Sequence, residues 1–282
     1  MRRFLLEHFY RIAASGWVPR GWFADELPPP PATADSAGPL KLEIVSHCWK
    51  YSWLLTYQLS SLVLHPPQKL SVTMTVFYSP EDEATKRVLN FFATQPVPGV
   101  TWNWWPLPKE RLFRRAIGRN EAALATAADW VWFTDCDQVF HRGCLDTLAE
   151  LLPGEQATLV YPRQVGCSKL LASDDPLFQR ISEHPEVVDI DVTRFEPVTH
   201  TRAVGALQIV PGYVARAAGY CKNIRYYLEP LTHWHKCYED RTYRWLLGTQ
   251  GKPIDVPGLF RVEHAAKGRK RVGRPGEALA TQ

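Results

Sequence analysis

In the first half of the chain, the pattern of apolar and polar residues predicts strands that alternate with helices. Residues 42–46 are a short β-rich run, and residues 53–64 predict a helix that ends before Pro66 and Pro67. Residues 70–77 alternate apolar and hydroxyl side chains, which is the period of a strand. Each predicted strand is therefore separated from the next by one predicted helix.

The same alternation continues over the next sixty residues. The segment Ser79-Pro80-Glu81-Asp82 predicts a helix start with Ser79 as its cap and Pro80 as its first residue, and this helix runs to about residue 92. A strand, an alanine-rich helix and a wholly apolar strand are predicted for residues 100–105, 111–128 and 130–133. Strands that recur about every thirty residues indicate βαβ units, which build a parallel sheet with right-handed crossovers.

The second half of the chain is less regular. Strand-like runs cover residues 157–161, 203–210 and 254–262, a helix-like run covers residues 238–247, and residues 167–200 predict long irregular segments. A run of four prolines within residues 28–39 is typical of a linker. The predicted parts are an N-terminal segment with this linker (1–39), a regular α/β half (40–165), a less regular half (166–264) and a basic tail (265–282).

Composition and charge limit the classes of function. The chain has 282 residues, 45% of them hydrophobic, and a formal net charge of +4. This is enough for one substantial α/β domain, and so modest a charge does not require a nucleic-acid partner. Basic residues gather at both ends: Arg2, Arg3, Lys267, Arg269, Lys270, Arg271 and Arg274. With the apolar residues among the first twelve they predict an amphipathic helix on an anionic membrane surface; solvated tails are the alternative.

The sequence predicts a cytoplasmic protein, with peripheral contact at the inner face of the membrane left open. No run reaches the about 20 apolar residues of a membrane span, and the first residues lack the apolar core of a secretory signal. The six cysteines show neither a C-x-x-C pair nor the spacing of a zinc finger. They fit a reducing compartment and do not indicate a structural zinc site.

The apolar run at residues 130–133 stops abruptly at two carboxylates, Asp135 and Asp137. In an open parallel sheet, ligands bind beyond the carboxyl ends of the strands. Hard divalent cations take carboxylate oxygens and share their other positions with phosphates, which suggests nucleotide chemistry. A strand-end turn capped by aspartates is the alternative. The chain lacks a Rossmann glycine fingerprint, a Walker loop and a G-x-S-x-G elbow, so a nucleotide would be held in another way.

These residues carry a resemblance to the family 2 glycosyltransferases of the GT-A fold. The chain has the family's Arg119-Asn120 helix start, alanine-rich helix, apolar strand and D-x-D motif in order. The pair Glu239-Asp240, about a hundred residues later, resembles the pair that opens a helix in the acceptor half. The resemblance covers residues 40–264. It implies a single GT-A-like, Rossmann-related α/β domain with a mostly parallel central sheet flanked by helices, and a donor-binding half followed by an acceptor-binding half.

The resemblance also implies a reaction: metal-dependent, inverting transfer of a sugar from a nucleoside-diphosphate sugar, most simply a UDP-sugar. The acceptor would be a glycan, a lipid-linked glycan or a small molecule. By the family pattern Asp137 ligates Mn²⁺ or Mg²⁺, and Asp135 contacts the ribose or a metal-bound water. His264 matches a further metal ligand, although a packing role is the alternative. Asp240 matches the catalytic base and Glu239 lies beside it; both also suit helix capping, and which acid is the base stays open.

For the nucleotide, the family pattern selects residues after the first two strands and at the helix before the D-x-D motif: Ser46, His47, Trp49, Ser79, Asp82, Arg119 and Asn120, together with Asp135. The segments after both strands depart from the family pattern, and Asp82 suits a helix cap equally well. Three other functions stay open: a retaining glycosyltransferase, a nucleotidyltransferase and a catalytically inactive carbohydrate-binding protein. A nucleotidyltransferase is expected to carry a glycine-rich, basic signature after the first strand, which this chain lacks.

Overall fold

A mostly parallel, seven-stranded sheet forms the centre of the computed structural model, which describes residues 2–30, 38–171, 184–233 and 237–264. The predicted basic tail lies outside the described residues. The strand order is β10-β6-β9-β4-β1-β2-β3, and β9 runs antiparallel to its neighbours β4 and β6. The bounds are β1 Leu40–Cys48, β2 Leu70–Tyr78, β3 Val100–Pro106, β4 Trp130–Phe133, β6 Val160–Pro162, β9 Gln208–Pro211 and β10 Lys252–Ile254. This confirms the predicted α/β class and its central sheet.

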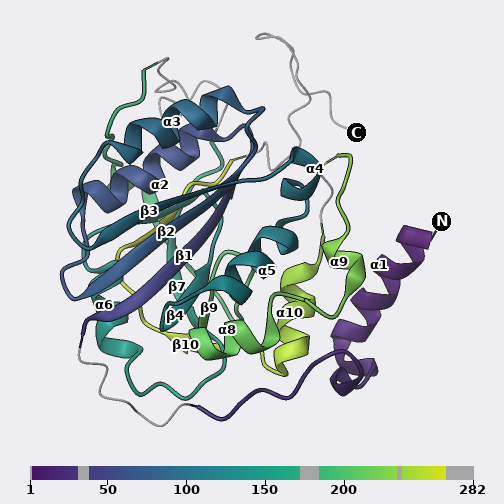
Figure 1. Ribbon diagram of the computed structural model, residues 1–282. Coiled ribbons are helices and arrows are strands. Elements are labelled where there is room, and N and C mark those ends of the chain that lie inside the picture. The colour runs from purple at the N-terminus through teal and green to yellow at the C-terminus, as the bar shows by residue number, and fades with distance from the viewer. Residues whose placement is uncertain (1, 31–37, 172–183, 234–236, 265–282) are drawn as a thin grey trace.

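Helices cover both faces of this sheet (Figure 1). On one side lie α2 Ser52–Leu64 and α3 Glu83–Ala93; on the other lie α5 Arg115–Ala125, α8 Gly212–Ala218 and α10 Glu239–Leu247. The shorter helices and the N-terminal helix are α1 Arg2–Ile12, α4 Lys109–Leu112, α6 Cys144–Leu151 and α9 Arg225–Leu228. A π-helical turn (Ala13–Trp17) and two 3₁₀ turns (Arg20–Trp22 and Val192–Arg194) are the other helical elements of the described residues.

A second, four-stranded sheet was not predicted from the sequence. Its order is β5-β11-β7-β8, with bounds β5 Gln138–Phe140, β7 Gln164–Ser168, β8 Phe195–Thr199 and β11 Leu259–Arg261. Prediction of one strand over residues 254–262 was wrong, because the chain turns at Gly258 and passes from one sheet to the other. Gly258 has a φ of +73°, and a Cβ there would lie 2.6 Å from the carbonyl oxygen of Arg142.

Two predicted helix boundaries were also wrong. The helix predicted for residues 111–128 is divided into α4 and α5, because Arg114 leaves the helical conformation (φ −104°, ψ 83°) and its buried guanidinium packs 4.7 Å from the ring centre of Tyr226. Helix α3 begins at Glu83, and its cap is Asp82 rather than Ser79. The backbone N–H of Thr85 donates to Asp82 Oδ1 at 3.3 Å. The predicted strands at residues 157–161 and 203–210 are found as β6 and β9 with displaced ends.

The N-terminal helix α1 packs on the same domain as the sheet. Tyr10 stacks on Tyr226 of α9 with ring centres 6.0 Å apart, and the indole N–H of Trp245 donates to the carbonyl of Val18 at 3.2 Å. The apolar residues Leu5, Phe9 and Ile12 of α1 stay exposed, and so do Trp17 and Trp22 after the helix. Within the described ranges, no helix is long and apolar enough to cross a membrane. Peripheral membrane contact stays a prediction, which binding to anionic vesicles would test.

The side chain of Trp132 anchors strand β4 in the hydrophobic core. This side chain is fully buried, its indole N–H donates to the carbonyl of Ala206 at 3.0 Å, and its ring meets Phe140 of β5 edge to face at 5.2 Å. Because β4 pairs in parallel with β1 on one side and antiparallel with β9 on the other, its carboxyl end has little freedom. The residues that follow, Thr134 to Asp137, therefore leave the sheet at a fixed point.

We expect Trp132→Phe to lower the free energy of unfolding by about 1–3 kcal/mol, because the change leaves the buried Ala206 carbonyl without its donor and opens a small cavity. Trp17→Phe makes the same substitution at a side chain that is 83% exposed and should change it by less than about 0.5 kcal/mol. Urea unfolding of both variants measures the difference. Equal effects would mean that β4 is not anchored in this way.

Candidate active site

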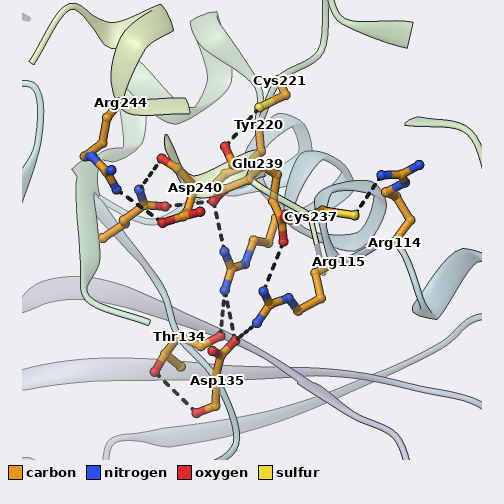
Figure 2. Close-up of polar contacts among 12 residues, drawn as sticks. Arg114, Arg115, Thr134, Asp135, Tyr220, Cys221, Cys237, Glu239, Asp240 and Arg244 are labelled. Atoms are coloured by element: carbon orange, nitrogen blue, oxygen red, sulfur yellow. Dashed lines mark hydrogen bonds and ion pairs between the residues drawn. The ribbon is translucent and has the colours of Figure 1, made fainter. Parts of the chain in front are cut away.

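Two strands and two helices bring the predicted chemistry to one edge of the central sheet. Strands β1 and β4 run parallel and side by side, so their carboxyl ends meet, and the N–H of Thr134 continues the pairing by donating to the carbonyl of Val45 at 2.9 Å. Helices α5 and α10 place their first turns at the same edge. Figure 2 shows the carboxylates and guanidinium groups that result.

Asp135, the first acid of the D-x-D motif, is held by two arginines of α5. Its Oδ1 accepts from Arg115 Nη1 at 2.8 Å and from Arg119 Nη2 at 3.1 Å. Arg119 is fully buried and also donates to the carbonyl of Thr134 and to the hydroxyl of Tyr220. Burial alone would raise the pKa of Asp135, but the two guanidinium groups overcome it and lower the pKa to about 2. Asp135 is therefore a carboxylate at any physiological pH.

Arg115 connects the two halves of the predicted site. Its Nη2 lies 3.1 Å from Oε1 of Glu239, while its Nη1 holds Asp135 (Figure 2). The Asp135 carboxylate is the main reason that the pKa of Arg115 lies well above its ordinary value. The side chain of Glu239 is only 2% exposed, and its Oε2 has no hydrogen-bond partner among the residues that the structure describes. Glu239, about a hundred residues from the D-x-D motif, thus shares one ion-pair network with it.

Asp240 is the more accessible acid of the pair that opens α10. Its side chain is 27% exposed and lies 3.3 Å from Nη1 of Arg244, one turn later. Arg244 is nearly buried and also donates to the carbonyl of Ala203 at 2.6 Å. The amide of Gln208, on β9, donates to the backbone carbonyl of Asp240 at 3.1 Å. Asp240 is therefore held in place from two sides while part of its carboxylate faces solvent.

Asp137 has the opposite environment to Asp135. It is half-buried, and it accepts one hydrogen bond from the amide of Gln138 at 3.2 Å. Burial, followed by the charge of Asp135, raises the pKa of Asp137 to about 7. A carboxyl group that is poorly neutralised and close to a second carboxylate is one that a divalent cation would stabilise, so these two acids fit the predicted metal.

His264 is brought toward this motif by the second sheet. The N–H of Val262, just after β11, donates to the carbonyl of Asp137 at 2.9 Å, and His264 follows two residues later. The imidazole is buried, with the rings of Tyr51 and Trp53 edge-on at 5.1 and 6.0 Å. Imidazole is an acceptable ligand for Mn²⁺, and the position is compatible with either metal binding or packing.

The end of β1 is packed tightly beneath α5. His47 is buried and stacks on Phe77 at 5.0 Å, and both of its ring nitrogens lack a hydrogen-bond partner within the described ranges. Burial, with help from Arg119 and Arg115, lowers the pKa of His47 well below its usual value, so the ring is neutral. A Cβ on Gly118 would lie 2.5 Å from His47 Nε2, so glycine is what permits this approach of α5.

The remaining predicted nucleotide contacts have local partners or are partly exposed. Asp82 accepts from the N–H of Lys50 as well as from Thr85, and the buried Ser79 hydroxyl accepts from the N–H of Glu81 at 3.4 Å. Asn120 Oδ1 accepts from the N–H of Tyr220 at 2.9 Å. Ser46 is buried, whereas Trp49 is half-exposed, with its ring edge-on to Phe113 at 5.4 Å. Their roles as nucleotide contacts stay predictions.

Sequence reasoning missed Arg115, Tyr220 and Gln208. The signal for Arg115 was present, because it lies four positions before Arg119 and a helix places residues at this spacing on one face. Tyr220 and Gln208 have no local signal. They reach the site only through β9 and the segment after α8, where the Tyr220 hydroxyl donates to Gln208 Oε1 at 2.8 Å.

Comparisons with known proteins give little further identification. No family model matches the sequence, and no curated protein matches it. Among solved structures, the fold is similar to the crystal structure of S. aureus TarS, residues 1–349, with a TM-score of 0.46 and 10% sequence identity. The match covers 81% of this chain and 58% of that chain, so this chain spans less than two thirds of the TarS structure. A TM-score this low carries no functional inference, and the proposal for function rests on the site itself.

The raised pKa of Asp137 predicts a pH-dependent effect of Asp137→Asn on the metal-free protein. In the folded state Asp137 keeps its proton up to about pH 7, whereas in the unfolded chain it ionises near pH 4. Between these values unfolding releases a proton, so this group's contribution to the free energy of unfolding falls as the pH rises, by at most about 1.4 kcal/mol per pH unit. Asparagine carries no such proton.

As the pH rises from 4.5 to 7.5, the free energy of unfolding of the variant should therefore increase relative to that of the parent. Urea unfolding of both proteins at the two pH values, with a chelator present, measures this change. Comparing the two pH values cancels any packing effect of the amide. A difference between the proteins that is the same at both pH values would contradict the environment described for Asp137.

Proposed function

We propose that this protein is a metal-dependent, inverting glycosyltransferase that uses a nucleoside-diphosphate sugar, most simply a UDP-sugar. The observation that carries the proposal is the Arg115 bridge between Asp135 and Glu239. It puts an acidic motif at a strand end, suited to a cation and phosphates, next to an acid pair suited to proton transfer. A transfer reaction needs both functions within reach of one bond.

Asp137 and His264 would hold the divalent cation, Mn²⁺ or Mg²⁺, with Asp135 beside it. The cation would supply Lewis-acid neutralisation of the charge that grows on the departing diphosphate. Arg115 and Arg119 add fixed positive charge on the other side of Asp135, which balances the acids of the motif. With Asp135 ionised and held by two arginines, its free oxygen is available to a ribose hydroxyl or to a water molecule.

Asp240 is the proposed base. It accepts the proton of the acceptor hydroxyl as that oxygen bonds to the anomeric carbon of the sugar. The bond from this carbon to the diphosphate oxygen breaks, and its electron pair leaves with the nucleoside diphosphate. Exposure favours Asp240 over Glu239, since 27% of its side chain faces solvent against 2% for Glu239. Glu239 would act by orienting Arg115.

The nucleotide would lie over the ends of β1 and β2. Trp49 is half-exposed there and offers an aromatic face to a base, while His47 below it is neutral and buried. A glycan or lipid-linked glycan acceptor would approach Asp240 from the side of α10. Retaining transfer, nucleotidyl transfer and carbohydrate binding without catalysis remain the competing functions, and the experiment below separates them.

Asp240→Asn should lower kcat for release of UDP from a UDP-sugar by about 10²- to 10⁴-fold, because the amide cannot accept the proton. Binding of the donor should change little, since Asp240 does not belong to the donor half. Glu239→Gln should lower kcat less, because Asp135 still holds Arg115. The assay measures UDP release with Mn²⁺ for a panel of UDP-sugars, followed by the anomeric configuration of the product.

Asp255→Asn is the matched control. The side chain of Asp255 is 77% exposed, and among the described residues its ion pair is with Arg163, which does not belong to the Arg115 network. It should leave kcat unchanged. An Asp240→Asn variant with full activity would sink the assignment of the base. A product with retained configuration would replace inversion with retention, and turnover that is independent of any divalent cation would refute the metal proposal.

A further inference from the structure

Two histidines and an aspartate meet at the C-terminal end of α2. His65 caps the last turn of α2, with its N–H bonded to the carbonyl of Ser61 at 2.9 Å. His141 follows β5, and its N–H donates to the carbonyl of Gly258 at 2.7 Å. Asp189 lies between the buried residues Val188 and Ile190. Three segments that are distant in sequence are therefore fixed independently at one place.

The geometry of these side chains is that of an open ligand set. One ligand atom from each of His65, His141 and Asp189 lies within 4.8 Å of the other two. The two imidazole ring centres are 4.0 Å apart and tilted by 56°. Ligand atoms around a tetrahedral zinc ion lie about 3.3 Å apart, so the set needs to contract by about 1.5 Å or less. Asp189 is exposed, and its Oδ1 accepts from the N–H of Ile190 at 2.8 Å, so its other oxygen would ligate the ion.

His65 has a ring nitrogen available to a ligand. Burial, and then the neighbouring His141, lowers the pKa of His65, with a smaller contribution from Arg142 that is opposed by Asp189. Nε2 of His65 is buried and has no hydrogen-bond partner among the described residues. A buried ring nitrogen without a partner is one that a bound cation would satisfy.

A hollow beside the imidazoles leaves room for further ligands. Its volume is about 220 Å³, and it is lined by His65, His141, Gln68, Arg142 and Asp146 among others. Asp146 stabilises the turn at this hollow by accepting from the N–H groups of Gln68 and Lys69 at 2.8 and 3.0 Å. A water molecule occupies about 30 Å³ of liquid, so one or more waters can complete the coordination of an ion.

We infer that His65, His141 and Asp189 form a zinc-binding site that joins the end of α2 to the β5–α6 turn and to the segment before β8. Two imidazoles and one carboxylate suit Zn²⁺, whereas Mg²⁺ and Ca²⁺ prefer all-oxygen sites. Cysteine spacing does not indicate this site, because it uses no cysteine and its ligands are far apart in the chain.

The site is separate from the acids at the sheet edge. Helix α2 has 13 residues and extends about 20 Å from its start, next to the loop after β1, to His65. Two connections nevertheless join this site to the D-x-D motif. Gln58 of α2 donates to the backbone carbonyl of Asp135 at 2.9 Å, and β5 begins directly after Asp137. An ion at His65 would thus brace both elements that support the D-x-D motif without contacting it.

The test is isothermal titration of ZnCl₂ into the full chain, free of any histidine tag and stripped with a chelator, without nucleotide. In Asp137→Asn, which removes a ligand of the proposed catalytic cation, we expect one zinc ion per chain and a rise in Tm of about 5 °C at a hundredfold excess over Kd, with the histidine changes made in that background. His65→Ala and His141→Ala should each weaken binding by at least about tenfold and remove the rise in Tm. Asp189→Asn should weaken it less, since the amide oxygen remains a poor ligand.

His200→Ala is the matched control, because His200 is also a half-buried histidine with a lowered pKa but lies outside the cluster. It should keep the parent affinity, and so should Asp137→Asn, which separates this site from the proposed catalytic cation. Co²⁺ provides a second readout. Bound with four ligands, it should absorb visible light strongly, and His141→Gln should remove this absorption. Absence of stoichiometric binding, or binding that survives both histidine changes, would overturn the inference whether or not the proposed function holds.

Discussion

The ion-pair bridge made by Arg115 is the interaction on which the candidate site depends. One guanidinium group binds Asp135 at the end of β4 and Glu239 at the start of α10. Loss of Arg115 would be costly mainly for Glu239, whose side chain is 2% exposed, because its charge would be left uncompensated away from water. The bridge therefore fixes the position of α10 relative to the central sheet. It also means that the acids of the two halves are placed by the same contact that stabilises their packing.

A consequence is that two aspartates one residue apart have different chemistry. Asp135 is paired with the arginines of α5 and has a pKa of about 2, whereas Asp137 accepts from the amide of Gln138 and has a pKa of about 7. Titratable groups whose environments push their pKa values apart are typical of sites where each group has a separate role. Here the difference in pKa suits a role for Asp135 in holding the two arginines and a role for Asp137 in exchanging its proton for a cation. The sequence, which shows only the motif, contains no sign of this division.

Much of the fold was predictable because period and spacing are local signals. The alternation of strands and helices up to Phe133 indicated the parallel sheet, and the abrupt end of an apolar strand indicated where its ligand edge lies. The errors arose where tertiary contacts override local pattern. A buried Arg114 side chain interrupts what reads as one helix, and a glycine turn sends residues 254–262 into two sheets. Arg115 could have been found from helical spacing, but the cluster of His65, His141 and Asp189 could not, since no periodicity connects its members.

The proposed function requires that the edge formed by Asp135 and Asp137 binds a nucleoside diphosphate through a divalent cation. The most direct measurement is the Tm of the full chain with UDP, GDP, ADP and CDP, each with Mn²⁺ and with a chelator. The account predicts that one nucleotide, most simply UDP, raises the Tm by several degrees with Mn²⁺ and by much less without it, because only the folded state binds the complex. A Tm that no nucleotide changes, or one that changes equally with and without Mn²⁺, would contradict it.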